Sequence, residues 1–295
     1  MQSEKVMIKR KSNNIIKFWH SYRQSLYGLI GFAILLIFII VALFAPIISP
    51  YNPHAMKGEV LLSPSLSHLM GTDHLGRDVF SRIVYGTRVS LSVGFIAAGL
   101  SAIIGIFIGS FSGYYGGIVD EIVDKIVDTF LMIPAFFLIL IIVAIFGNSI
   151  FYIMLVIGLT TWPQNARLMR AQALSLRERT FVMVARATGE SNIRILFTHI
   201  IPNGIYPVLA NTALQMGGAI LTEAALSFLG LGDPNFVSWG KMIYQARPYM
   251  TFAWWAVVFP GIFIVLAVVS FSFIGDGLQY TFNPKLNVKQ KKVSA

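Results

Sequence analysis

The sequence predicts an all-α, polytopic membrane protein with six transmembrane helices. Of its 295 residues, 56% are hydrophobic and 12% are charged, whereas soluble domains are about 45–50% apolar and about 25% charged. Six apolar runs approach the roughly 20 residues that a helix needs to cross a bilayer. Lys and Arg are spread unevenly among the segments between these runs. This composition excludes a water-soluble enzyme.

The six predicted spans lie at residues 29–48, 91–111, 129–146, 150–162, 205–231 and 252–274. The first follows a basic tail and is too long for the core of a signal peptide, so we expect a retained span. Pro134 marks an expected kink in the third span, because proline lacks a backbone donor. Pro163, Gln164 and Asn165 cut the fourth span short, although its helix could extend to Met169.

Charge predicts the orientation of these spans. Alternate segments between them hold seventeen Lys and Arg residues, against six in the other segments. By the positive-inside rule, both termini and the segment 163–204 face the cytoplasm, and 51–88 lies outside. The net charge of +10 is therefore a topology signal, and we expect a lipid bilayer as the environment and no nucleic-acid partner.

The predicted organisation follows from these spans and their orientation. It comprises a basic cytoplasmic tail (1–27), a first transmembrane helix (28–50), an extracytoplasmic segment (51–88), a five-helix core (89–278) and a cytoplasmic C-terminal tail (279–295). The core contains a long cytoplasmic loop at residues 164–203.

Small and acidic residues recur at four-residue spacing. On the second span, glycines recur every four residues at Gly105, Gly109 and Gly113, which lets a neighbouring helix approach closely. Acids do so before the third span, at Asp120, Asp124 and Asp128. The acidic row is either a solvated helix stem or a cation relay. We favour the stem, because no carboxylate follows deeper into the span.

Glu223 lies within the apolar stretch 219–231, where a charged group costs about 3 kcal/mol on insertion scales. Its carboxyl must therefore face protein or water. It is either a residue of a translocation pathway or gate, or a buried carboxyl that is hydrogen-bonded to a neighbouring helix. The sequence leaves both alternatives open.

Several kinds of catalytic and metal site are not expected. The chain has no cysteine, so it has no thiolate metal site and no cysteine nucleophile. Its five histidines are scattered, with none at i,i+4 spacing from another, so we expect no metal site. The spans hold no Ser-His-Asp or paired-carboxylate constellation, which disfavours an intramembrane hydrolase. Without a G-x-x-x-x-G-K-[ST] motif there is no phosphate cradle, so we expect no catalytic residue and no cofactor bound by this chain.

The loop that follows the fourth span, residues 165–202, is the most informative segment. Residues 166–179, 181–188 and 193–200 have helical patterns. Gly189 can adopt positive φ as a C-cap, and Ser191 is a good N-cap for the next helix. We therefore predict a helix-turn-helix elbow, whose rigid shape suits the grip of a soluble partner.

This elbow resembles the coupling motif of permease subunits from ABC importers. In that motif, Glu-Ala-Ala, then a glycine, then a distal Leu-Pro mark the loop that docks on the ATPase. The coupling residues that the resemblance implies here are Ala185, Arg186, Ala187, Gly189, Ser191 and Pro202. Met183 and Val184 replace the glutamate and the first alanine of the motif.

Two further stretches narrow the resemblance. Residues 71–82 and 85–91 resemble the extracytoplasmic signature of the second permease of dipeptide, oligopeptide and nickel importers, and 223–232 with 238–240 resemble its fifth span. The signature residues are Gly71, Thr72, Asp73, Gly76, Arg77, Asp78 and Arg82. The glycines permit tight turns, and the acids and arginines can pair to hold them. Alternatively, Arg77 and Asp78 touch a peptide or a docked binding protein; we favour the structural role.

The resemblance implies a bacterial cell-membrane importer of the type I ABC permease fold. Its other parts are a homologous second permease in a heterodimer, two ABC ATPases that bind ATP and Mg²⁺, and an extracytoplasmic substrate-binding protein. Peptides are the expected substrate, and nickel or metal chelates are the alternative. A proton-coupled secondary transporter is the rival from another class, but the chain shows no duplicated halves with paired broken helices.

Overall fold

The computed structural model describes residues 18–56 and 58–282, and the regular structure of this part is helical apart from one isolated bridge. The helices are α2 (Leu26–Leu43), α3 (Ala45–Ile48), α4 (Val79–Tyr115), α5 (Gly117–Met132), α6 (Ala135–Phe146), α7 (Ile150–Arg177), α8 (Thr180–Ala187), α9 (Asn192–Ile195), α10 (Ile201–Gly204), α11 (Tyr206–Leu226), α12 (Trp239–Ala246) and α13 (Trp255–Phe282). Single π-helical turns at Leu196–Ile200 and Ser227–Leu231 join α9 to α10 and extend α11. The all-α prediction is confirmed.

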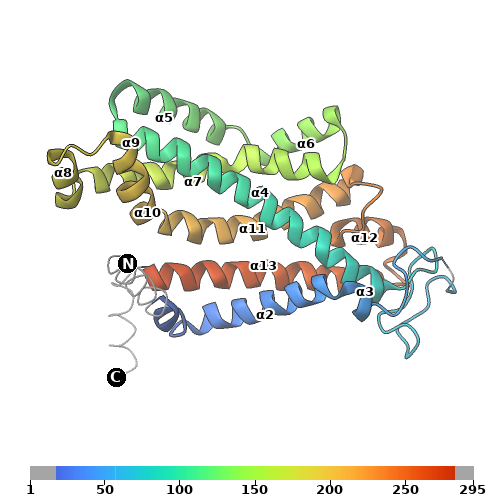
Figure 1. Ribbon diagram of the computed structural model, residues 1–295. Coiled ribbons are helices and arrows are strands. Elements are labelled where there is room, and N and C mark those ends of the chain that lie inside the picture. Colours follow the sequence, from blue (N-terminus) through green and yellow to red (C-terminus); the bar gives the residue numbers. More distant parts are fainter. Residues whose placement is uncertain (1–17, 57, 283–295) are drawn as a thin grey trace.

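The long helices run side by side (Figure 1). Helix α11 lies between α4 and α7 on one side and α13 and α2 on the other, and it contacts α4, α7 and α13. The elbow helices α8 and α9 lie at one end of the bundle, and α12 and the segment before α4 lie at the opposite end. The long helices therefore connect the elbow at one end of the bundle to α12 and the segment before α4 at the other.

In the described part of the chain, four helices are long and apolar enough to cross a membrane: α2, α4, α11 with its π-helical turn, and α13. Helices α5 and α6 together would make a fifth span, bent by 81°. Helix α7 has 28 residues, but its second half carries arginines. The count of six spans stays a prediction, as do the cytoplasmic termini, because residues 1–17 and 283–295 lie outside the described residues.

The helices differ in extent from the predicted spans at three places. Helix α4 begins at Val79, twelve residues before the predicted second span, because Asp78 caps it by accepting a 2.7 Å hydrogen bond from the Ser81 amide. The expected kink at Pro134 is confirmed, and it divides the third predicted span between α5 and α6. Helix α7 continues through Pro163 to Arg177, so the helix expected at 166–179 is the end of α7.

The glycine row on α4 confirms the predicted close approach of a second helix. A Cβ on Gly109 would lie 2.2 Å from the carbonyl oxygen of Ala166, and one on Gly113 would lie 2.5 Å from that of Arg170. One on Gly105 would lie 2.4 Å from Cβ of Asn165. The backbones of α4 and α7 are therefore in close contact along the part of α7 that follows Pro163.

At the end of the bundle opposite the elbow, Trp239 of α12 is fully buried. Its indole nitrogen donates to the carbonyl oxygen of Ile83 on α4 at 3.2 Å, and its ring contacts Phe38 and Phe263. This aromatic cluster joins α2, α4, α12 and α13.

Candidate functional site

The predicted elbow is present and is built as its capping residues require. Gly189, which follows α8, has a φ of +81°, a conformation that favours glycine. The hydroxyl of Ser191 accepts a 3.4 Å hydrogen bond from the Arg194 amide and caps α9. Nothing lies within 4 Å of where a Cβ on Gly189 would sit, so backbone conformation rather than space selects glycine here.

One side of the elbow is anchored to the bundle. Val182 and Ala185 of α8 are buried with Ile195 and Leu196 against α7. Tyr114 of α4 donates a 2.9 Å hydrogen bond to Oδ1 of Asn192, and its ring lies 5.2 Å from the guanidinium carbon of Arg186. The elbow is thus held to the ends of both α4 and α7.

The opposite side of the elbow is exposed and apolar. The exposed residues there include Phe181, Met183, Val184 and Ile193. Met183 and Val184, which replace the acidic and small residues of the motif, are 50% and 55% exposed. Among the predicted coupling residues, Ala185 is buried, whereas Arg186, Ala187, Gly189, Ser191 and Pro202 are exposed. Arg179, Arg186 and Arg194 are also exposed on the elbow, so its surface combines apolar side chains with positive charge.

The signature residues at the other end are mostly buried and pair with one another. The Asp73 carboxylate accepts from the Arg77 side chain at 2.7 Å and lies 3.6 Å from Nε of Arg82. Both arginines donate to Oε1 of Gln245 at 3.0 Å. Asp78 is held by His68 at 2.8 Å and caps α4. These contacts favour the structural role, because the groups are not free to meet a peptide.

The other signature residues shape the turn in which these charges lie. Gly71 and Gly76 have φ values of +73° and +71°, and a Cβ on Gly76 would lie 2.1 Å from the carbonyl oxygen of Gly58. The hydroxyl of Thr72 donates to the carbonyl oxygen of Glu59 at 2.7 Å. The turn therefore depends on glycine at both positions.

Glu223 is 1% exposed, and it is not among the residues that line the two cavities described below. Its Oε1 accepts hydrogen bonds of 2.7 Å from Ser227 and from Ser238, and Ser238 also caps α12. Within the described residues, its other oxygen has no partner. The carboxyl thus joins the end of α11 to the start of α12, and these contacts favour the buried-carboxyl alternative over a pathway or gate.

The aspartate row on α5 is paired with arginines of α7. Arg170 donates to Asp120 at 2.6 and 2.8 Å and lies 3.0 Å from Asp124, and Arg167 pairs with Asp128. Each carboxylate therefore has a cationic partner. This arrangement holds α5 against α7 and leaves no free carboxylate in the row for a cation relay.

An amide cluster that the sequence interpretation missed joins α4, α7 and α11 midway along the bundle. Asn165 is fully buried and donates to Ser101 at 3.0 Å and to Gln215 at 2.7 Å. Asn211 donates to Oδ1 of Asn165 at 2.9 Å. The available signal was the pair Asn211 and Gln215, four residues apart on one face of an apolar helix, together with Gln164 and Asn165.

Beside this cluster, a hollow of about 290 Å³ opens among α4, α7 and α11. It is lined by Ala98, Ile157, Thr161, Gln164, Asn211, Leu214, Gln215, Gly218, Ala219 and Thr222. Its polar groups are neutral amides and hydroxyls. Such groups at mid-depth are costly against lipid, so this face is suited to water or to a polar partner.

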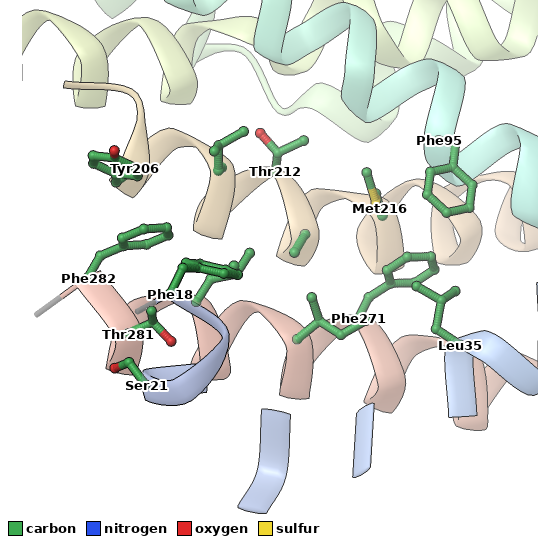
Figure 2. Close-up of a pocket in the computed structure, with 14 residues that line it drawn as sticks. Phe18, Ser21, Leu35, Phe95, Tyr206, Thr212, Met216, Phe271, Thr281 and Phe282 are labelled. Carbon is green, nitrogen blue, oxygen red and sulfur yellow. The ribbon is translucent and has the colours of Figure 1, made fainter. Parts of the chain in front are cut away.

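A second, larger groove of about 990 Å³ lies between α11, α13 and the start of the described chain. Figure 2 shows Tyr206, Ser21 and Thr281 at one end, with Met216 and Phe271 towards the other. Most of its lining is apolar. It therefore suits hydrocarbon rather than a hydrated polar solute, and the hollow beside the amide cluster is the better candidate for a polar pathway.

Comparison with known proteins identifies the family. The family model for the binding-protein-dependent transport system inner membrane component matches residues 105–288. The chain belongs to this family. A second model, the N-terminal TM domain of oligopeptide transport permease C, matches residues 16–64. The multi-pass inner membrane location and the non-catalytic character follow from membership, since ATPase activity in this family resides on separate subunits.

Relatives of this permease family match nearly the whole chain. It is 41% identical over 266 residues to the dipeptide transport system permease protein DppC of Alkalihalophilus pseudofirmus, covering 90% of this chain and 88% of the relative. It is 40% identical over 278 residues to DppC of Escherichia coli K12, covering 92% and 93%. An inward-facing structure of the MetNI methionine ABC transporter matches with a TM-score of 0.55 at 19% identity, covering 68% of this chain and 96% of that chain. This likeness confirms the permease fold.

Proposed function

We propose that this chain forms half of the translocation pathway of an ATP-driven importer of di- and oligopeptides. The relatives that match about nine-tenths of the chain are named dipeptide permeases, which supports the substrate class. The observation that carries the mechanism is helix α7, which runs without a break from the mid-bundle amide cluster to the elbow. A motion applied at the elbow would therefore reach the hollow directly.

The proposed assembly has three kinds of protein partner. A homologous second permease supplies the other half of the pathway in a heterodimer, and it would face the side of α4, α7 and α11 on which the hollow opens. Two ABC ATPases carry ATP and Mg²⁺, and one of them grips the exposed apolar side of the elbow. A binding protein delivers peptide at the opposite end of the bundle.

The proposed cycle is alternating access. ATP binding closes the ATPase pair, the elbow around Gly189 moves with it as a rigid body, and the long helices open the pathway to the outside. Hydrolysis and release reverse the motion. The bias comes from tighter binding of ATP to the closed state, as any ligand-driven population shift requires.

Two other functions are less well supported by the side chains. An importer of nickel or metal chelates would use the same machinery, but the residues that line the hollow include no carboxylate and no imidazole. A proton-coupled secondary transporter needs a free carboxylate in the pathway, whereas Asp120, Asp124 and Asp128 are paired with arginines and Glu223 is buried beside α12. The secondary-transporter alternative predicts uptake that persists without ATPase subunits and stops when the proton gradient collapses.

The test uses the absence of native cysteine. Ser191→Cys on the elbow and Ser67→Cys at the opposite end, both at exposed serines, are placed in membranes with all candidate subunits and a short thiol crosslinker. We expect a nucleotide-sensitive crosslink from Ser191→Cys to cysteines in the surface groove of the ATPase, and none from Ser67→Cys. A thiol at 191 that is labelled from the cytoplasmic side but never crosslinks would remove the coupling role.

A further inference from the structure

The amide cluster has two parts: Asn165, whose side chain is fully hydrogen-bonded, and an open part, the amides of Gln164, Asn211 and Gln215. Asn165 uses both ends of its side chain, on Ser101 and Gln215 as donor and on Asn211 as acceptor. The contacts that Nε2 of Gln215 makes are longer, 3.2 Å to the Thr161 carbonyl oxygen and 3.4 Å to Oε1 of Gln164. Asn165 thus orients the other amides, while the Nε2 side of Gln215 is free to exchange a weak contact for a better one.

The open part lies where three helices reach their midpoints. Ala98, Thr161 and Gln215 all line the hollow and lie about half way along α4, α7 and α11 respectively. Gln164 is exposed, and Asn211 and Gln215 are partly exposed. Their amides therefore border the hollow rather than the interior of the bundle.

We propose that Gln164, Asn211 and Gln215 form a binding strip for the peptide backbone of the transported substrate, with Asn165 as its positioning residue. This inference rests on the proposed function and assigns it a place in the membrane. Each peptide unit carries one N–H donor and one C=O acceptor, and a side-chain amide offers both complements. The strip is thus matched to the part that all peptides share.

The side chains of the strip are uncharged, which suits a site that releases the peptide rather than one that binds it tightly. A carboxylate or an arginine at this depth would pair strongly with one terminus of a peptide and slow its release. Amides give net stabilisation of only about 0.5–1.5 kcal/mol for each hydrogen bond, because the peptide exchanges one set of partners for another. Peptides with different side chains would therefore pass the same site.

The geometric test uses glycines with open space where a Cβ would sit. Gly218 lines the hollow, and Gly261 lies on α13 outside it; nothing lies within 4 Å of the Cβ position of either. Gly218→Cys and Gly261→Cys are reconstituted with cysteine-free partner subunits and binding protein, and modification by a small thiol reagent is followed during ATP turnover with and without dialanine. We expect dialanine to slow modification at least fivefold at position 218 and not at 261.

The energetic test removes the hydrogen-bonding group. We expect Gln215→Leu to lower dialanine import per ATP at least tenfold, and Gln215→Asn, which keeps the amide, to restore part of it. Gln172→Leu is the matched control, since Gln172 is on α7 but outside the hollow. Import by Gln215→Leu at the parental rate, or unslowed modification of Gly218→Cys, would overturn the inference and leave the proposed function standing. Failure of the parental complex to import any dipeptide would overturn both.

Discussion

The hydroxyl of Tyr114, in the last turn of α4, donates a 2.9 Å hydrogen bond to Oδ1 of Asn192 in the first turn of α9. These residues are 78 positions apart in the chain, and their contact fastens the far side of the elbow to a helix that also borders the hollow. The attachment of the elbow therefore depends on α4 as well as on the covalent continuity of α7.

Removing this hydrogen bond should loosen coupling without preventing assembly. Tyr114→Phe keeps the ring beneath Arg186 and costs about 1 kcal/mol. We expect fewer substrate molecules imported per ATP in vesicles, with the complex recovered at the parental yield. Tyr115→Phe is the control, because Tyr115 is 45% exposed. Equal coupling ratios for the two variants would contradict the role of Tyr114.

Substitutions at Gly189 should rank by their tolerance of positive φ. A left-handed conformation costs about 1–2 kcal/mol for an ordinary residue, more for a β-branched one and less for asparagine. We therefore expect Gly189→Asn to import normally, and Gly189→Val and Gly189→Trp to assemble but hydrolyse ATP without import. Uptake and hydrolysis measured on the same vesicles decide this, and normal transport by Gly189→Trp would refute it.

Contact between α4 and α7 should be intolerant of side chains. A Cβ on Gly109 would collide with the Ala166 carbonyl, so Gly109→Leu must separate the two backbones. We expect loss of the assembled complex, measured by size-exclusion chromatography in detergent. Gly99→Leu on the same helix is the control, since nothing lies within 4 Å of its Cβ position. Comparable yields from both variants would argue against a close helix contact.

Glu223 should behave as a structural residue. Glu223→Gln retains an Oε1 that can accept from Ser227 and Ser238, whereas Glu223→Leu leaves both buried hydroxyls without their acceptor, at about 1–3 kcal/mol. We expect normal import by the glutamine variant and a lower melting temperature for the leucine variant. Loss of import by Glu223→Gln at unchanged melting temperature would instead favour a pathway or gate role.

His74 should make the segment before α4 sensitive to acid. Burial lowers the pKa of His74 from its usual 6.5, and Arg77 and Arg82 act in the same direction while Asp73 opposes them. Because the unfolded chain then binds the proton more readily, stability falls as the pH drops through 6.5 towards the folded pKa. His74→Phe keeps a ring on Tyr249, which the imidazole stacks on at 5.3 Å.

We expect the melting temperature of this variant to fall less than that of the parent between about pH 7.5 and about pH 5.5. Part of the slope should remain, since burial and the same arginines also lower the pKa of His54. Identical pH profiles for the parent and His74→Phe would show that His74 does not titrate in this range.

Features that depend on neighbours in the chain were predictable. Gly189 and Ser191 act through the backbone within four residues, and the glycine row on α4 follows from helical spacing alone, so the elbow and the close helix contact could both be inferred. Features that depend on distant partners were not. Asn165 meets Gln215 fifty positions away, and Asp120 meets Arg170 at the same separation. No periodicity specifies which helices become neighbours.

The two hydrogen-bond partners of Glu223 also differ in how far they could be predicted from the sequence. Ser227 lies one turn along α11 and was available to local reasoning, but Ser238 reaches the carboxyl only because the chain turns back through the segment before α12. The break at Pro134 is an intermediate case. Proline predicts a kink but not its size, which is 81° between α5 and α6.

The length of α7 beyond the amide cluster determines how far the amides move when the elbow moves. Twelve residues separate Asn165 from Arg177, which at 1.5 Å per residue is an arm of about 18 Å. If α7 and the part of α4 packed on it tilt together about Asn165, a tilt of about 10° displaces the elbow end of α7 by about 3 Å, while groups within a few ångströms of the pivot move by well under 1 Å. A movement of the elbow would thus cause a smaller movement of the amides, exerted with greater force. That movement is enough for the amides to exchange hydrogen-bond partners without separating the helices.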